Sequence, residues 1–122
     1  MNKISLYKTG KFYNAYGDNG IILHYLLKYK YTEYKNSVGF PDSALNKVKT
    51  SLENNNISYA IYNKDILIED YKGIDKNYKN TLKEALKSYD MESRITRLKN
   101  KINNLELDDL EKIIEGLEDV SI

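Results

Sequence analysis

The fold of this chain is decided by residues 7–18, which read YKTGKFYNAYGD. Apolar and aromatic residues lie on both sides of Gly10, in residues 4–7 and again in residues 12–16. Glycine readily takes the backbone conformation of a tight turn, and aromatic residues are enriched in strands. The stretch therefore predicts two short strands that are joined by a turn at Gly10.

The segments that follow this hairpin predict a helix and then a less regular crossing. Residues 17–20, GDNG, interrupt the strand pattern and offer a helix start. Residues 19–30 then carry apolar side chains at helical spacing, which predicts a largely buried helix. Residues 31–38 alternate only weakly, a pattern that fits either a strand or an irregular crossing.

A second helix is expected after residues 39–43, GFPDS, which combine a stop with a helix start. Asp42 or Ser43 can cap the free backbone N–H groups of this helix. The helix is expected to end in the asparagines at 54–56. Strands are expected at residues 57–62 and 66–68, joined by a turn at 63–65.

The last third of the chain predicts helices with a heptad-like apolar seam. A helix that folds back over its own sheet and a hairpin that forms a dimer both fit this pattern. In the second case Ile95, Leu98 and Ile102 are the candidate interface. A last helix is expected to restart at residues 107–109. The seam runs through Tyr78, Leu82, Ala85 and Tyr89 and, after a shift at Asp90, through Met91, Ile95, Leu98, Ile102 and Leu105.

Composition excludes several classes of protein. The 122 residues contain no cysteine and a single histidine, His24, which excludes disulfide scaffolds, thiol catalysis and multi-histidine metal sites. No apolar run approaches the roughly 20 residues that span a bilayer. Residues 1–5 lack the apolar region of a signal peptide. We therefore expect a cytoplasmic protein that does not enter the membrane.

Charge is divided unevenly along the chain. The formal net charge is only +1. Residues 1–62 carry eight lysines against four acidic residues, a net charge of +4, and residues 63–122 carry eleven basic against fourteen acidic residues, a net charge of −3. The nearly neutral total therefore hides a basic half and an acidic half.

The sequence contains no arrangement typical of an enzyme. The acidic pairs Glu69-Asp70 and Asp108-Asp109 are sequence neighbours, whose side chains point to different faces of a strand or helix, so neither forms an acid–base dyad. Residues 17–20 lack the Lys-Ser/Thr of a phosphate-binding loop. His24 is interpreted as a histidine packed at the surface. We expect no enzymatic activity, no cofactor and no metal.

Residues 7–18 resemble the opening strand pair of the N-terminal mismatch-recognition domain of the MutS family. In that domain a tyrosine-basic-x-glycine run leads into Gly-x-Phe-Tyr-Glu, an aromatic residue and an acidic helix start. The resemblance recurs at residues 39–44, GFPDSA, and at residues 58–61, SYAI, which match the family's Gly-Val-Pro-x-x-Ala helix and its closing Val-Ala-Ile strand. It covers residues 3 to about 68.

The resemblance implies an α/β fold, with a small mixed sheet of about five strands flanked by helices. It does not extend to the C-terminal helices. We therefore expect a MutS-like domain over residues 1–72 and a helical extension over residues 73–122, which either packs on the same domain or forms an interface.

The resemblance also implies which residues touch DNA. In the MutS family the phenylalanine inserts from the minor-groove side and stacks on a mispaired base, and the glutamate hydrogen-bonds that base. The matching residues are Phe12 and Asn14, with Lys11 and Tyr13 beside them. Asn14 replaces the carboxylate with an amide, and Lys11 stands where the family commonly has an acidic residue. The alternative for Phe12 is a strand residue that packs inward on the sheet.

A non-enzymatic DNA-binding module without an ATPase or clamp segment is the function that the resemblance implies. Its partner is double-stranded DNA, and Lys8, Lys47 and Lys49 are candidate phosphate contacts. The alternative is a protein-interaction or adaptor module that kept the fold and lost mismatch recognition. Its protein partner, or a second copy of the chain, then binds through the tyrosine-rich surface or through the C-terminal helices.

Overall fold

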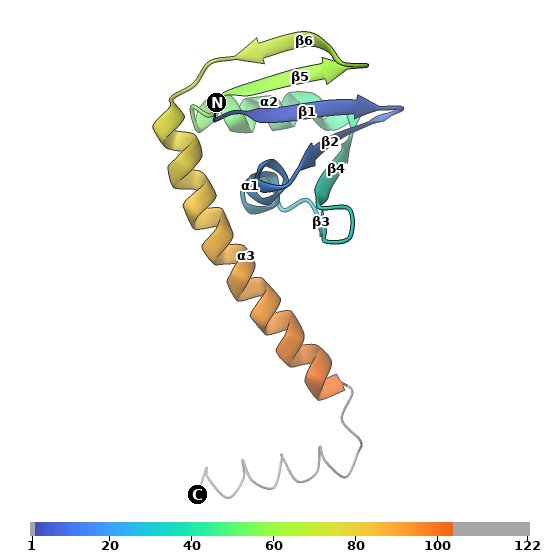
Figure 1. Ribbon diagram of the computed structural model, residues 1–122, viewed down its shortest axis with the longest axis vertical. Helices are drawn as coiled ribbons and strands as arrows, with labels where there is room; N and C mark the ends of the chain where they lie inside the picture. The colour runs from blue at the N-terminus through green and yellow to red at the C-terminus, as the bar shows by residue number, and fades with distance from the viewer. Residues whose placement is uncertain (1, 104–122) are drawn as a thin grey trace, which may run out of the picture. The chain divides into compact units, whose positions relative to one another are not determined.

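The expected hairpin is present in the computed structural model, which describes residues 2–103 (Figure 1). Strand β1 (Ile4–Thr9) and strand β2 (Phe12–Tyr16) pair antiparallel, with Thr9 opposite Phe12. Gly10, in the turn between them, has a φ of 62°, a left-handed conformation that glycine adopts without a steric penalty. The register fixes which side chains share a face, because strand residues point alternately to opposite faces.

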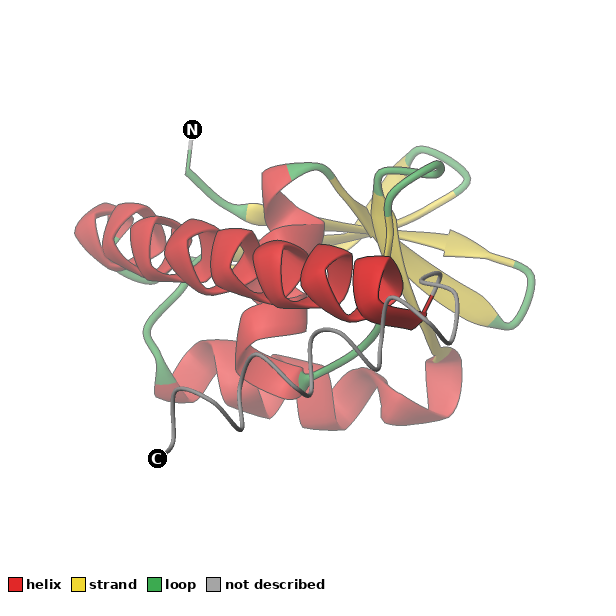
Figure 2. Cartoon of the chain, turned by 90° about the horizontal axis from the view of Figure 1, so that it is seen from below, coloured by secondary structure: helices red, strands yellow, loops and turns green. Residues whose placement is uncertain are grey.

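The hairpin lies in the middle of a mixed sheet of six strands, in the order β3-β4-β2-β1-β5-β6. β5 runs parallel to β1, and the other neighbours are antiparallel. Figure 1 shows the strands in this spatial order, with β6 at the top. Figure 2 shows that the twist of the sheet rotates neighbouring strands relative to one another. The expected α/β fold is confirmed, with six strands in place of about five. The remaining strands are β3 (Tyr31–Thr32), β4 (Ser37–Pro41), β5 (Tyr59–Asn63) and β6 (Ile66–Tyr71).

Strands β3 and β4 lie where the sequence pattern was ambiguous. The two residues of β3 pair only with Ser37 and Val38 of β4. The rest of β4 contains Gly39, Phe40 and Pro41, which were expected to form a break before a helix. This expectation is wrong because the end of β4 has a partner strand on one side only, so the missing N–H of Pro41 does not interrupt the sheet.

Two helices follow the strands of the hairpin and of β4. Helix α1 spans Asp18–Leu27, and helix α2 spans Leu45–Asn54 after the 3-10 turn η1 (Asp42–Ala44). Asp42 and Ser43 do not cap α2: no side chain forms a cap hydrogen bond at the start of η1 or α2. Instead the backbone N–H of Asp42 donates to the carbonyl of Lys11 over 2.8 Å, which ties η1 to the hairpin turn.

One face of the sheet forms the core together with α1 and α2. Alternate residues of the central strands are buried on this face, and both helices add apolar side chains to it. Burial of this apolar surface is the main source of stability for a domain of this size. The sheet contributes Ile4, Leu6, Tyr13, Ala15, Val38, Phe40, Tyr59 and Ile61, and the helices contribute Ile21, Ile22, Leu23, Val48 and Leu52.

The hydroxyl groups of three tyrosines at the edge of this core are partly removed from water. The hydroxyl of Tyr59 donates to Oε1 of Glu53 over 3.1 Å, and burial together with this bond to a carboxylate raises the pKa of Tyr59. Burial, with a contribution from the charge of Asp18, also raises the pKa of Tyr31 and Tyr78. In each case the cause is that the phenolate would be costly in a poorly solvated place beside a negative charge.

Helix α3 (Asp75–Asn103) extends through the division between two compact units, residues 1–89 and 90–122. The domain boundary expected after residue 72 stays a prediction. Within the first unit, Tyr78 and Ala85 are buried, and the hydroxyl of Tyr78 hydrogen-bonds the side-chain amide of Asn19 over 2.8 Å. The first part of α3 is therefore a component of the same core as the sheet.

The second unit is described only as far as residue 103. Met91, Ile95 and Leu98 are exposed there, with 63% of Leu98 accessible. The side chain of Ile102, and the last helix expected from residues 107–109, lie outside the described part of the chain.

Strand β6 is an edge strand with an apolar N-terminal half. Ile66, Leu67 and Ile68 are 68%, 49% and 57% exposed. The pairing of β6 with β5 contains a register shift, because Glu69 lies opposite Ile61 whereas Leu67 lies opposite the next residue, Tyr62. Ile68 is therefore an additional residue that bulges out of the ladder.

The start of α1 lies directly on the backbone of the sheet at Gly20. A Cβ atom at Gly20 would lie 2.8 Å from the carbonyl oxygen of Ala15 and 3.2 Å from the backbone nitrogen of Val38. Ala15 and Val38 are paired neighbours on β2 and β4. The first contact is shorter than a Cβ atom makes with rigid backbone, and the second is unusually tight, so glycine is the residue that permits this approach of helix and sheet.

We predict that Gly20→Ala lowers the free energy of unfolding by about 1–3 kcal/mol, because α1 must move off the sheet. Urea unfolding followed by circular dichroism measures this change. Asn46→Ala, at an exposed position of α2, is the matched control and should stay within about 0.5 kcal/mol of the unmodified chain. An unchanged midpoint for Gly20→Ala would show that the helix is not held at this distance.

Candidate nucleic-acid interface

The face of the sheet opposite the core carries Phe12, Asn14 and Tyr16 from β2. These residues alternate with Tyr13 and Ala15, which are buried on the core face. The ring of Phe12 is 54% exposed. The inward-packed alternative for Phe12 is therefore wrong, because the hairpin register turns this ring away from the core.

Tyrosines from three neighbouring strands line up on the same open face. The rings of Tyr62 and Tyr7 stack with centroids 5.2 Å apart at 15°, and Tyr16 lies 6.0 Å from Tyr7 at 48°. Tyr7 is the residue directly beside Tyr62 in the parallel pair β1–β5. These contacts stiffen the centre of the open face without covering it.

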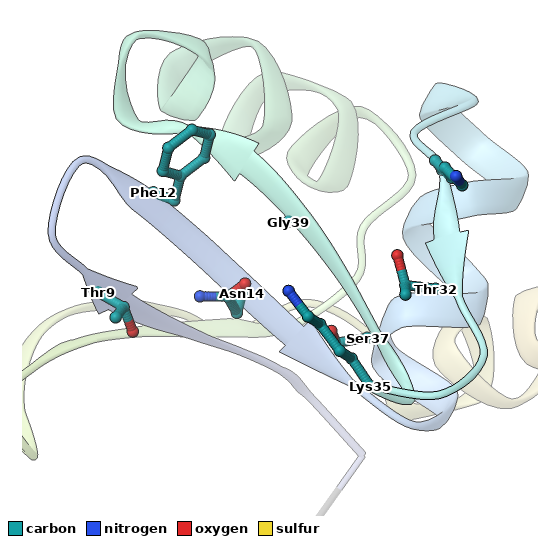
Figure 3. Close-up of a pocket in the computed structure, with 8 residues that line it drawn as sticks. Thr9, Phe12, Asn14, Thr32, Lys35, Ser37 and Gly39 are labelled. Atoms are coloured by element: carbon teal, nitrogen blue, oxygen red, sulfur yellow. The ribbon is translucent and has the colours of Figure 1, made fainter.

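A cavity of about 450 Å³ opens on this face beside Phe12. Figure 3 shows the Phe12 ring at the start of β2, next to the end of β4, with Asn14 two residues farther along the same strand. The amine end of Lys35 points toward Asn14 across the cavity. The lining is polar apart from Phe12 and consists of Thr9, Phe12, Asn14, Lys30, Thr32, Lys35, Ser37 and Gly39.

The position of Asn14 depends on Gly39, its direct neighbour on β4. A Cβ atom at Gly39 would lie only 3.1 Å from Oδ1 of Asn14. Oδ1 of Asn14 therefore occupies space beside Gly39 that a side chain at that position would restrict. An amide there offers both hydrogen-bond donors and an acceptor.

Positive charge in the cavity is not neutralised by its surroundings. No carboxylate is among the lining residues, and neither Lys30 nor Lys35 forms an ion pair with any residue between 2 and 103. Nζ of Lys35 lies 5.7 Å from the centroid of the Tyr34 ring, a weak contact at an exposed site. Both ammonium groups are therefore available to an anion.

The structure separates the predicted DNA contacts into two sets. Lys11 is exposed in the hairpin turn beside Phe12. Tyr13 is only 6% exposed and stacks on Phe40 in the core, with centroids 5.8 Å apart, so it is not part of the open face. Strand alternation explains this difference, since Tyr13 follows Phe12 directly.

The three lysines predicted as phosphate contacts lie away from the cavity. Lys8 is on the same face of β1 as the buried Ile4 and Leu6. Lys49, on α2, forms an ion pair with Glu69 at 2.7 Å, and Lys47 is exposed on the same helix. The lysines that line the cavity are instead Lys30 and Lys35, which lie near the β3–β4 hairpin.

The single histidine of the chain, His24, has a hydrogen-bond partner in the backbone. Nδ1 of His24 lies 2.6 Å from the carbonyl oxygen of Tyr29, which can only accept, so this nitrogen carries the proton. His24 is packed at the surface, as expected. Among residues 2–103 no three acidic or histidine side chains gather into a group that could hold a metal ion. In the same residues no helix is long and apolar enough to cross a membrane.

Comparison with known proteins agrees with this geometry. The family model of MutS domain I matches residues 1–65, which is more than half of the chain. The chain therefore belongs to the MutS domain I family. A search of curated proteins gives no match.

We predict that Gly39→Ala and Asn14→Ala are energetically coupled. In the Asn14→Ala background, Gly39→Ala should stabilise the chain by about 0.5–1 kcal/mol, because alanine is favoured over glycine within a strand. In the unmodified chain this gain should disappear, because the new Cβ must displace the amide of Asn14. A double-mutant cycle by urea unfolding measures the coupling. Additive effects would show that Asn14 does not lie over Gly39.

Proposed function

We propose that this chain is a DNA-binding module that inserts Phe12 into duplex DNA where base stacking is already weak, as at a mismatch. The observation that supports this function is the exposed Phe12 ring at the hairpin end of the open face. An apolar wedge that enters a base step must separate two stacked bases, at a cost of a few kcal/mol. A mismatch has lost part of this stacking, so insertion there costs less.

Three lysines around Phe12 supply the charge that such binding needs. Lys11 lies next to Phe12 in the turn, and Lys30 and Lys35 line the cavity beside it. If each neutralises one phosphate, log K falls with log salt with a slope of about −2.7. This is a small footprint, so a single domain binds weakly and loses most of its affinity at high salt.

Asn14 sets the mode of base contact within this proposal. Its amide can donate and accept hydrogen bonds, and it carries no charge. The matching family residue is a glutamate, which only accepts when it is ionised. Asn14 therefore tolerates more base edges than a carboxylate does, and the preference for a mismatch comes chiefly from Phe12.

We predict that Phe12→Ala removes the preference for mismatched over matched duplex and leaves the salt-dependent part of binding in place. Fluorescence anisotropy with labelled G·T-mismatched and matched duplexes, at low and moderate salt, measures both quantities. A stacking contact of this kind is worth about 1–3 kcal/mol.

Tyr16→Ala is the matched control for this prediction, because Tyr16 is an exposed aromatic residue on the same face of the same strand. It should keep the mismatch preference. Absence of salt-dependent binding in the unmodified chain would reject the proposed function. A preference that survives Phe12→Ala would instead reject the wedge.

A second candidate function is supported by the apolar stripe on α3. Met91, Ile95 and Leu98 are exposed at the four- and three-residue spacing of a coiled-coil seam. A protein partner or a second copy of the chain can cover such a stripe. In this case the module is an adaptor or interaction domain, or the dimer supplies two DNA-binding faces.

We predict that Ile95→Asp combined with Leu98→Asp shifts the chain to a smaller species on a sizing column, because two buried carboxylates oppose association. Circular dichroism checks that the helix content is kept. Thr96→Asp, exposed on the same helix outside the stripe, should leave the elution volume unchanged. Unfolding of the double variant would show that these side chains belong to the core of a single chain.

A further inference from the structure

The cavity beside Phe12 brings together side chains that can bind the base and the phosphate of a single nucleotide. It holds one exposed aromatic ring, one amide, two lysines and several hydroxyl groups, with no carboxylate among them. Its volume of about 450 Å³ lies within the usual range for small-molecule sites, roughly 300–1,000 Å³.

We propose that this cavity binds a nucleotide that carries a terminal phosphate monoester, with its base against Phe12 and its phosphate between Lys30 and Lys35. The source is either a free nucleoside monophosphate or the phosphorylated end of a DNA strand. For the strand end, the proposal rests on the DNA-binding function proposed above.

The charge of the cavity favours a terminal phosphate over an internal one. A phosphate monoester carries a charge of about −1.5 to −2 at pH 7, whereas each phosphodiester of a strand carries one negative charge. Lys30 and Lys35 together supply two positive charges, and neither is paired with a residue of the described chain. Lysine binds phosphate as a compact point charge with three donors.

The cavity extends along the β2–β4 pair from the aromatic ring to a hydroxyl group. Phe12 pairs with Pro41 and Tyr16 pairs with Ser37, so Phe12 and Ser37 lie four residues apart along the β2–β4 pair. This separation is about 13 Å along the strands. The aromatic ring therefore lies at one end of an elongated cavity, and the hydroxyl of Ser37 lies at the other.

Asn14 lies between these two ends. Oδ1 of its amide lies close to Gly39, which has no side chain. From there it can exchange hydrogen bonds with the edge of a base that stacks on Phe12. Thr32, on the far side of β4, adds a hydroxyl that can donate to a phosphate oxygen.

A titration of the isotope-labelled full chain with three probes tests the free ligand. The probes are deoxyadenosine 5′-monophosphate, deoxyadenosine and ribose 5-phosphate, and chemical shifts of the open face report binding. We expect the nucleotide to bind at least about tenfold more tightly than either fragment, a difference of about 1.4 kcal/mol. Equal affinity for nucleotide and nucleoside would overturn the proposal.

Variants assign the ligand to this cavity. Lys30→Ala combined with Lys35→Ala should reduce the affinity for the nucleotide to that for the nucleoside, and Phe12→Ala should reduce it to that for the sugar phosphate. Lys79→Ala removes an exposed lysine of α3 and should change nothing. Full nucleotide affinity in the Lys30/Lys35 variant would overturn the site, provided that its urea midpoint shows an intact fold.

Duplexes with a recessed strand that ends in a phosphate or in a hydroxyl distinguish the two sources. Tighter binding of phosphorylated ends, lost in the Lys30/Lys35 variant, identifies the strand end as the ligand. Nucleotide binding without this difference identifies the free nucleotide, and it stands even if no duplex binds. Mismatch binding that depends on Phe12, with no affinity for the nucleotide, overturns this inference and leaves the proposed function intact.

Discussion

The pairing register of β1 and β2 is the constraint on which the rest of the structure depends. It sets Thr9 against Phe12, so that Tyr13 and Ala15 enter the core and Phe12 and Asn14 remain outside. A slip of one residue in this register would move every side chain of β2 to the opposite face of the sheet, so that Phe12 would be buried and Tyr13 exposed. On the core side of the sheet, α1 approaches the backbone of Ala15 and Val38 closely at Gly20. The open face is therefore defined by the same register that places Tyr13 and Ala15 in the core.

The sequence pattern predicts the regular elements of this fold and fails where partners decide the conformation. The hairpin around Gly10 and the turn at residues 63–65 follow from local preferences, and Lys64 and Asp65 indeed take positive φ values. β4 could not be predicted in this way, because Gly39 and Pro41 are typical of a break. They are tolerated in a strand because β3 is only two residues long and leaves that end of β4 unpaired on one side.

The candidate site was predicted in part, and only for residues close together in sequence. Phe12 and Asn14 follow from the resemblance of one short segment to the MutS family. Lys30 and Lys35 could not be selected among the lysines of the basic half, because the cavity is assembled from separate strands and the β3–β4 hairpin. Lys49 illustrates the same difficulty, since its ion pair joins α2 to Glu69 of β6, a residue distant in the sequence.

The edge strand β6 has a consequence for how the chain behaves at high concentration. An exposed apolar edge is a template on which another strand can add, which is the first step of aggregation. The extra residue Ile68 breaks the regular spacing of hydrogen-bonding groups along this edge, and Asp70 places a negative charge in its C-terminal half, where Glu69 is paired with Lys49. A second β6 that approaches antiparallel meets both obstacles at once. The irregular pairing of β6 thus opposes the addition of further strands to the sheet, although the edge backbone stays exposed to solvent.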